Sequence, residues 1–266
     1  MSTEVRVLDQ GFVRLVEQMG SDAAIVRAAR VSYGEGTKTV REDAALIDYL
    51  MRHRHTSPFE MVEFTFHVRA PIFVARQWFR HRTASANEVS ARYSVLEDRF
   101  YRPEAWRAQA QENKQGSEGR FQNPEADRVL EDAYRTAYAA YRRLLELGVA
   151  REEARILLPV GIYTEFYWKQ DLHNLFHFLK LRLDRHAQYE IRQYARAIAA
   201  IVRERVPLAW TAFEEHVLLG VALSKTEREA LSGLLDREAY RAALRARGLR
   251  KSRVREALEK LFPEPD

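Results

Sequence analysis

The fold is decided by residues 61–71, which read MVEFTFHVRAP. From Val62 to Val68 every second residue is apolar, and the residues between them are polar or charged. Because successive side chains of a strand point to opposite faces, this alternation predicts a strand with one buried face. Pro71 suits the first position of a helix, so the pattern predicts a helix over 71–80 directly after the strand.

Further elements follow on both sides of this stretch. Residues 39–42 (TVRE) have the form of a capping box, which predicts a helix ending near Arg52. Residues 126–147 are amphipathic and are followed by Gly148, as is typical of a long surface helix. Between residues 150 and 205 the sequence predicts a short helix ending before Pro159, a strand over 162–168 and helices over 171–183 and 186–205. After Pro207 it predicts short helices, with a capping box at 224–227 and a stop at Gly248. Polar loops are predicted over 85–90 and 107–123.

Strands and helices are mixed, without the regular alternation of a doubly wound sheet. We expect an α+β fold, with mixed helices packed around a mostly antiparallel sheet and a helical C-terminal extension. One domain is expected over residues 1–215 and the extension over 216–266. The hydrophobic content of 46% is ample for a packed core.

No apolar run approaches the roughly 18 residues of a membrane helix, and the first residues lack the basic-then-apolar pattern of a secretory signal. We therefore expect a cytoplasmic protein without a membrane partner. The chain has no cysteine, which excludes disulfides, thiolate nucleophiles and cysteine-ligated metal centres. Any covalent chemistry must come from another group.

The charge balance favours anionic small-molecule ligands. The chain has 43 Lys and Arg against 38 Asp and Glu, and 36 of the 43 cations are Arg, whose planar fork suits phosphate and carboxylate. Residues 221–266 carry eleven Lys and Arg against eight Asp and Glu, which is +3 of the net +5. Because the rest of the chain is close to neutral, total charge predicts no nucleic-acid partner.

The densest polar cluster spans residues 76–94, which read RQWFRHRTASANEVSARYS. Within the predicted helix, Arg76 and Arg80 are four residues apart, and Gln77 is three before Arg80, so all three can project from one side. From the residues alone two interpretations are open. The stretch is a solvated helix end with Arg–Glu pairs, or it is a binding site for anions.

The order of residues in this cluster resembles a family signature. Arg-His-Arg at 80–82, followed after seven residues by Ser90, resembles the signature of the flavin-dependent thymidylate synthases, as do the flanking QWF and ARYS. The resemblance covers roughly residues 5–215. Further matching segments are LDQGF at 8–12, AARVS at 28–32, HTSPFE at 55–60, ARILLP at 154–159, LRL at 181–183 and AQYEI at 187–191.

The resemblance implies an enzyme that methylates deoxyuridine monophosphate (dUMP) to dTMP without a cysteine nucleophile. Methylenetetrahydrofolate would supply the carbon, and FAD reduced by NADPH would supply the reducing equivalents. Residues 1–215 would then be the catalytic domain. The family also implies a homotetramer whose active sites combine residues from more than one chain.

The resemblance also implies binding residues. Around dUMP it places Gln77, Arg80, Glu88, Ser90, Arg92 and Arg155. Arg182 would face the pyrimidine as the principal catalytic residue, since a guanidinium stabilises negative charge but is a poor proton acceptor. Without the family match, Arg182 would be interpreted as a residue on the exposed side of a helix. Ser90 is interpreted as a hydrogen-bonding group, because a nucleophilic serine needs a base that nothing in the sequence places beside it.

The flavin contacts implied by the family come from several segments, and the sequence has no G-x-G-x-x-G fingerprint, so a Rossmann mode is not expected. Some family members have Asn at the positions of Asp171 and His177, which weakens the assignment there. His173 and His177 are four apart and could face a metal, but no third ligand joins them, so no metal is predicted. The implied flavin residues are His55, Ser57, Arg80, His81, Arg82, Glu88, Asp171, His173 and His177.

Two other functions remain as rivals. A nucleic-acid-binding protein would use arginine and aromatic residues for phosphates and base stacking. A non-enzymatic oligomeric scaffold would use the clustered arginines for ion pairs between subunits. Either rival predicts a colourless protein, whereas a flavoenzyme is yellow.

Overall fold

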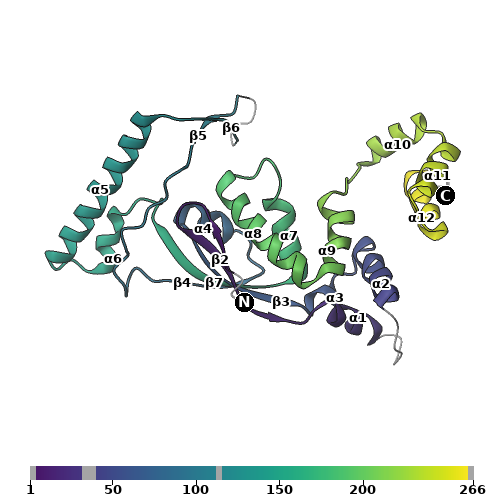
Figure 1. The fold of residues 1–266 in the computed structure, drawn as a ribbon, viewed down its shortest axis with the longest axis horizontal. Coiled ribbons are helices and arrows are strands. Elements are labelled where there is room, and N and C mark those ends of the chain that lie inside the picture. The colour runs from purple at the N-terminus through teal and green to yellow at the C-terminus, as the bar shows by residue number, and fades with distance from the viewer. Residues whose placement is uncertain (1–3, 32–39, 112–115, 263–266) are drawn as a thin grey trace. The chain divides into compact units, whose positions relative to one another are not determined.

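The computed structural model describes residues 4–31, 40–111 and 116–262. Two compact units divide the chain, the first over Met1–Leu218 and the second over Leu219–Asp266 (Figure 1). The first unit contains all of the described strands. The second contains helices only, over the residues that are described.

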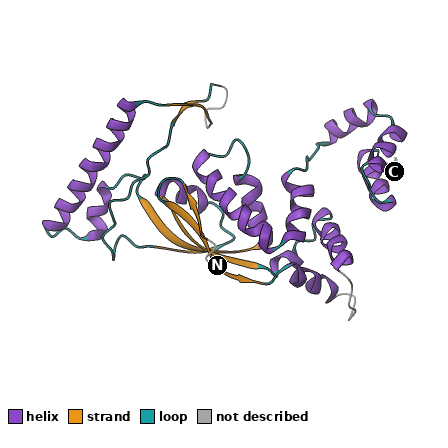
Figure 2. Cartoon of the chain, viewed as in Figure 1, coloured by secondary structure: helices purple, strands orange, loops and turns teal. Residues whose placement is uncertain are grey.

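The first unit is built on an antiparallel sheet with the strand order β1-β2-β3-β7-β4. Figure 2 shows these strands in orange. The alternating stretch forms the central strand, and its side chains at positions 64, 66 and 68 are fully buried, so the predicted strand is confirmed. The strands are β1 (Glu4–Val7), β2 (Gly11–Met19), β3 (Glu63–Pro71), β4 (Ser85–Glu88) and β7 (Tyr163–Asp171).

One face of this sheet is covered by helices, and the expected α+β architecture is confirmed. Trp168 on β7 packs against Trp78 of α4 and Phe178 of α7, and these large rings fill the core. The helices that begin at Asp22 and Pro207 are also joined, because the carboxylate of Asp22 accepts hydrogen bonds from the amides of Leu208 and Ala209. The helices are α1 (Asp22–Arg30), α2 (Val40–Arg52), α3 (Ser57–Glu60), α4 (Ile72–Trp78), α7 (Leu172–Arg182), α8 (Tyr189–Arg205), α9 (Pro207–Phe213) and a π-helical turn (Glu214–Leu218).

A smaller core lies beneath the long helix α5 (Pro124–Glu146), where Tyr134 stacks on Phe100. Gly161 is required there, since a Cβ at this position would lie 2.1 Å from the Tyr134 hydroxyl. Asn123 caps α5, and Gly148 ends it with a φ of 85°. Beside it lie α6 (Arg151–Ala154), a 3-10 turn (Arg155–Leu157) and a hairpin of β5 (Trp106–Gln109) and β6 (Ser117–Phe121).

The second unit consists of α10 (Lys225–Leu234), α11 (Arg237–Ala246) and α12 (Lys251–Leu261). The predicted capping box is present, because Ser224 and Glu227 cap each other's backbone amides. Gly248 follows α11 with a φ of 80°, as expected of a helix stop. Val254 and Leu258 are the buried apolar residues of α12.

Several local predictions were wrong. Residues 85–88 are a strand rather than a loop, because they pair with β7 through the backbone while all four side chains stay exposed, which leaves no alternation. Residues 106–121 contain the β5–β6 hairpin rather than a plain loop. Pro71 ends β3 and caps α4 instead of opening the helix, and α8 begins three residues late, at Tyr189.

The N-terminal part of the chain was predicted only in part. Thr39 of the predicted capping box at 39–42 lies outside the described residues, although the helix ends at Arg52 as expected. Strands β1 and β2 and helix α1 were not predicted from the sequence. Among the described residues of the whole chain, no helix has both the length and the apolar character needed to cross a membrane.

Candidate active site

Helix α4 places the arginine-rich segment at the protein surface. Its start is tied to the loop before β7, where the amide of Ile72 donates to the carbonyl of Ile162 at 2.9 Å. Trp78 is fully buried against β7 and α7, which turns the opposite side of the helix outward. The helix then ends in a turn in which the His81 amide donates to the Trp78 carbonyl at 3.0 Å. This turn places His81 beside α7.

Three of the predicted site residues meet at this turn. The Nε of Arg182 donates to Nε2 of His81 at 3.0 Å, and its Nη2 donates to the backbone carbonyl of Gln77 at 3.4 Å. Arg182 is the last residue of α7, so two helices that are a hundred residues apart in sequence build this contact. Because the Nε2 atom accepts a hydrogen bond, the ring proton lies on Nδ1.

The electrostatics keep this His81 imidazole neutral. Burial, together with the neighbouring Arg182 and His177, lowers the pKa of His81 to about 4. Burial also lowers the pKa of Arg182, which still stays charged at neutral pH because a guanidinium titrates far above it. The pair is therefore a fixed cation held by a neutral ring.

The neighbouring arginines have no counter-charge in the described part of the chain. Arg80 and Arg82 are exposed, and no described carboxylate pairs with them or with Arg76. The solvated helix end with Arg–Glu pairs, which remained open from the residues alone, is therefore a poor account of 76–82. Unpaired guanidinium groups beside a neutral imidazole fit an anionic ligand such as a nucleotide phosphate or the pyrophosphate of FAD.

A second group forms around Glu152. The Nε of Arg92 donates to its Oε2 at 3.0 Å, and the Nε of Arg155 donates to its backbone carbonyl at 3.2 Å. Ser90 accepts from the amide of Arg92 at 3.3 Å, and no described base contacts its hydroxyl. The hydrogen-bonding interpretation of Ser90 is therefore the one that its surroundings favour.

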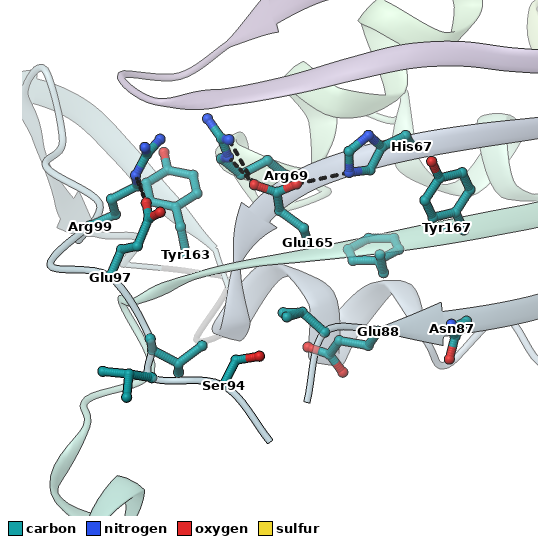
Figure 3. A pocket seen from close by; sticks show the side chains of 14 residues that line it. His67, Arg69, Asn87, Glu88, Ser94, Glu97, Arg99, Tyr163, Glu165 and Tyr167 are labelled. Atoms are coloured by element: carbon teal, nitrogen blue, oxygen red, sulfur yellow. Dashed lines mark hydrogen bonds and ion pairs between the residues drawn. The ribbon is translucent and has the colours of Figure 1, made fainter. Parts of the chain in front are cut away.

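Glu88 lies at a pocket of about 490 Å³ on the exposed face of the sheet (Figure 3). Its Oε1 accepts from the hydroxyl of Thr164 at 2.6 Å. Deeper along β3 and β7, Glu165 bridges two side chains, accepting from Nε of Arg69 at 2.7 Å and contacting Nε2 of His67 at 2.8 Å. Sequence reasoning missed this group, although its members occupy the polar positions of the two alternating strands.

The remaining predicted flavin residues are spread over two helices. Asp171 caps α7, accepting from the amide and side chain of Asn174 at 2.9 and 2.7 Å. His177 lies beside His81, with ring centroids 6.0 Å apart, and His173 is one turn earlier. Among the described residues, no group of three or more His, Asp or Glu could hold a metal.

His55 and Ser57 lie elsewhere in the unit, at the start of α3. The ring of His55 is 5.9 Å from that of Tyr49, and Ser57 lines a different pocket beside α1. Within the described residues, no hydrogen bond or ring contact joins either of them to 80–82. Among the described residues, neither His55 nor Ser57 is therefore joined directly to the Arg182–His81 contact.

A chain of hydrogen bonds that the sequence did not reveal links Gln77, at the surface, to the buried Glu190. Its Nε2 donates to Oε1 of Gln188, whose Nε2 donates to Oε2 of Glu190 at 2.8 Å. Glu190 is only 2% exposed, pairs with Arg107 of the hairpin and accepts from the hydroxyl of Tyr101 at 3.1 Å. The only sequence signal was the match of 187–191 to the family.

Comparisons with known proteins agree on one family. The family model described as "Thymidylate synthase complementing protein" matches residues 14–208. A protein of Thermus thermophilus named flavin-dependent thymidylate synthase is 71% identical over 258 residues, covering 97% of this chain and 96% of its own. A protein of Treponema denticola with the same name is 56% identical over 242 residues, covering 88% and 91%.

A solved structure agrees with these sequence matches. It is the UMP/dUMP methylase PolB from Streptomyces cacaoi bound with 5-Br dUMP, which is 35% identical and superposes with a TM-score of 0.73. The match covers 82% of this chain and 100% of that one. The family model spans well over half of the chain, and the relatives align over nearly all of it. The chain therefore belongs to the flavin-dependent thymidylate synthases, the family of thymidylate synthase complementing proteins.

Proposed function

We propose that this chain converts dUMP to dTMP. It transfers the one-carbon unit of methylenetetrahydrofolate to C5 of the uracil, and NADPH provides through FAD the two electrons that turn this unit into a methyl group. Tetrahydrofolate and NADP are the other products. Family membership, the names of the relatives and the 5-Br dUMP bound to the similar methylase support this reaction.

The binding of dUMP is assigned to six residues, of which Ser90, Arg92 and Arg155 already gather around Glu152. Guanidinium and hydroxyl groups are suited to a phosphate dianion. The full set is Gln77, Arg80, Glu88, Ser90, Arg92 and Arg155. The hydrogen bonds from Glu190 through Gln188 support this role, because they orient the side chain of Gln77.

Arg182 is the proposed catalytic residue. Its Nε is engaged by His81 and its Nη2 by Gln77, so Nη1 is the nitrogen without a described partner. A fixed cation there stabilises the negative charge that spreads over N3 and the carbonyls when C5 becomes nucleophilic. No cysteine is needed for this activation, and the chain has none.

The flavin is assigned to residues whose donors fit an anionic cofactor. Arg80 and Arg82 are unpaired among the described residues, and His81 is a neutral donor through Nδ1. Bound FAD supplies redox chemistry that side chains lack. The complete proposed set is His55, Ser57, Arg80, His81, Arg82, Glu88, Asp171, His173 and His177.

We also propose a homotetramer. His55 and Ser57 lie at the start of α3 and have no hydrogen bond or ring contact with 80–82 among the described residues of one chain, which supports sites that combine residues of several chains. Self-association would bring the α3 residues of one chain to the arginines of another.

The observation that carries the function is the Arg182–His81–Gln77 contact beside unpaired Arg80 and Arg82. Its test uses purified protein with dUMP, methylenetetrahydrofolate, NADPH and FAD, and measures dTMP by chromatography. The protein should be yellow, its flavin band should bleach with NADPH, and dTMP should form only in the complete mixture. A complete mixture that leaves dUMP unmethylated contradicts the proposal.

A further inference from the structure

The second unit carries a group of cations outside the part of the chain that matches the family model. Between Ala239 and Arg255 the sequence has seven Lys or Arg and no Asp or Glu. They fall on the middle and end of α11, the four-residue turn after it and the first half of α12. Four of them define what we call the basic turn: Arg245, Arg247, Arg250 and Lys251.

The basic turn has no counter-charge among the residues that the structure describes. All four side chains are exposed, and the one hydrogen bond that they make is from Arg247 to the carbonyl of Ala243 at 3.2 Å. Cations nearby are neutralised, as in the pairs Arg241–Glu238 and Arg255–Glu259. Because like charges repel, an anion at the turn would lower the free energy of this surface.

The start of α12 adds to this positive potential. Ser224 and Asp236 cap the first amides of α10 and α11 with their side chains. The residue at the corresponding position of α12 is Arg250, whose side chain makes no cap. The free amides of this eleven-residue helix therefore lie at the basic turn, at the positive end of the helix dipole.

The surroundings discriminate between the possible anionic partners. The exposed large apolar side chains of this unit all precede Asp236, and none is found over the described residues 236–262. A helix that lies on a membrane surface needs exposed apolar residues beside its cations, so a lipid surface is a poor fit. Three of the four cations are Arg, whose fork matches phosphodiester oxygens.

The connection between the two helices is of a kind found in DNA-binding proteins. A four-residue turn containing Gly248 joins α11 to α12, as in helix-turn-helix units. Val254 and Leu258 face inward, so Lys251, Ser252 and Arg255 remain exposed on the first half of α12. In that class of unit the same half of the second helix approaches DNA.

We propose that the basic turn and the exposed start of α12 bind the sugar-phosphate backbone of duplex DNA, independently of sequence. This function is separate from thymidylate synthesis. The expectation of no nucleic-acid partner rested on the near-neutral charge of residues 1–220, and it did not consider how the cations of residues 239–255 are spaced.

The test is fluorescence anisotropy with the full-length protein and a labelled duplex oligonucleotide. Saturating FAD and dUMP occupy the nucleotide sites, so that their arginines do not contribute. The variant R245Q/R247Q/R250Q/K251Q should weaken binding at least about tenfold at low salt. The slope of log K against log salt should fall by roughly 0.9 for each phosphate that a removed cation neutralised.

A matched control removes four exposed arginines of α5, at positions 128, 135, 142 and 143. It has the same loss of charge and should keep both DNA affinity and salt slope. Both variants should form dTMP at the unaltered rate, since neither touches the proposed site. Absence of duplex binding, equal loss in both variants, or tighter binding to single-stranded RNA or phosphatidylserine vesicles would overturn the proposal.

Discussion

At the scale of single residues, Arg182 and His81 show how a cation can be fixed without a carboxylate. A carboxylate partner would cancel the charge that the proposed role of Arg182 requires. A neutral imidazole orients the guanidinium through one hydrogen bond and leaves its full charge in place. Sequence matching identified both residues, but their direct contact came only from the packing of α4 against α7.

Replacing Arg182 with Ala should lower the rate of dTMP formation to below about 1% of the unaltered rate, because the charge on the pyrimidine loses its stabilising partner. The flavin should stay bound, since Arg182 is proposed to face the substrate. Activity assays and the visible flavin spectrum measure the two effects separately. The variant R182K, which keeps the charge but loses the planar fork, should have a rate between those of R182A and the unaltered protein. If R182A loses flavin to the same extent as activity, Arg182 has a cofactor-binding role instead.

His81 makes stability depend on pH. In the unfolded chain its imidazole takes up a proton near 6.5, but in the folded chain the pKa of His81 is about 4. Acidification between these values therefore favours unfolding, and the contribution of His81 is fully present only above about pH 6.5. Because the ring is only half buried, we expect an effect on the order of 1 kcal/mol after solvent screening.

Urea unfolding at a series of pH values measures this effect. The variant H81N retains an oxygen that can accept from Arg182 but does not titrate, so its stability should change less between pH 6.5 and 4. The variant H186N, at an exposed position, is the control and should follow the unaltered protein. Parallel pH profiles for H81N and the unaltered protein would exclude His81 as the cause.

At the scale of elements, the β5–β6 hairpin is connected to the candidate site through Glu190. This residue links Arg107 of the hairpin to Gln188 and thereby to Gln77 at the end of α4. The link depends on tertiary contacts between segments more than eighty residues apart. Local sequence patterns could not predict this link, because no feature of the neighbouring sequence marks any of these residues as a partner of another.

The variant E190Q should therefore act on both stability and substrate binding. It leaves the partly buried Arg107 without its counter-charge, which we expect to cost about 2–4 kcal/mol of unfolding free energy. A less firmly held Gln77 should raise KM for dUMP more than it lowers kcat. Urea unfolding and steady-state kinetics measure the two effects.

The control for this prediction is E131Q, which breaks the exposed pair with Arg102. Surface pairs contribute about 0–1 kcal/mol, so stability and KM should change little. If E190Q destabilises the protein without changing KM, the link to Gln77 is structural only.

How far an element could be predicted depended on how its side chains are buried. The strand β3 has one face in the core, so its alternation is visible in the sequence. The strand β4 is exposed on all four side chains and is held by backbone pairing to β7, which leaves no mark in the composition. The ion pair of Glu165 with Arg69 likewise depends on the register between β3 and β7, which a single sequence does not specify.

At the scale of the whole molecule, the proposed site residues fall into separate groups within one chain. The described residues of one chain join 77, 81 and 182 in one contact and gather 90, 92 and 155 in another, while His55 and Ser57 have no hydrogen bond or ring contact with either group. The family resemblance predicted the members of the site. Their division into groups could be seen only in the folded chain.

Mixing two inactive variants tests whether sites are shared between chains. R182A and R155A should each be nearly inactive alone, whereas hybrid oligomers made by co-expression should recover measurable dTMP formation. The recovery arises because some shared sites then contain both intact arginines. Size-exclusion chromatography with light scattering should give the mass of a tetramer, and a monomer without recovery would contradict the shared site.

The order of the strands has a consequence for behaviour at high concentration. The two outer strands, β1 and β4, are each four residues long, whereas the inner strands have nine. An outer strand is where a foreign chain adds to a sheet, and a short one offers few backbone partners for such growth. The protein thus keeps its long strands in the interior of the sheet, an arrangement that disfavours assembly into fibres.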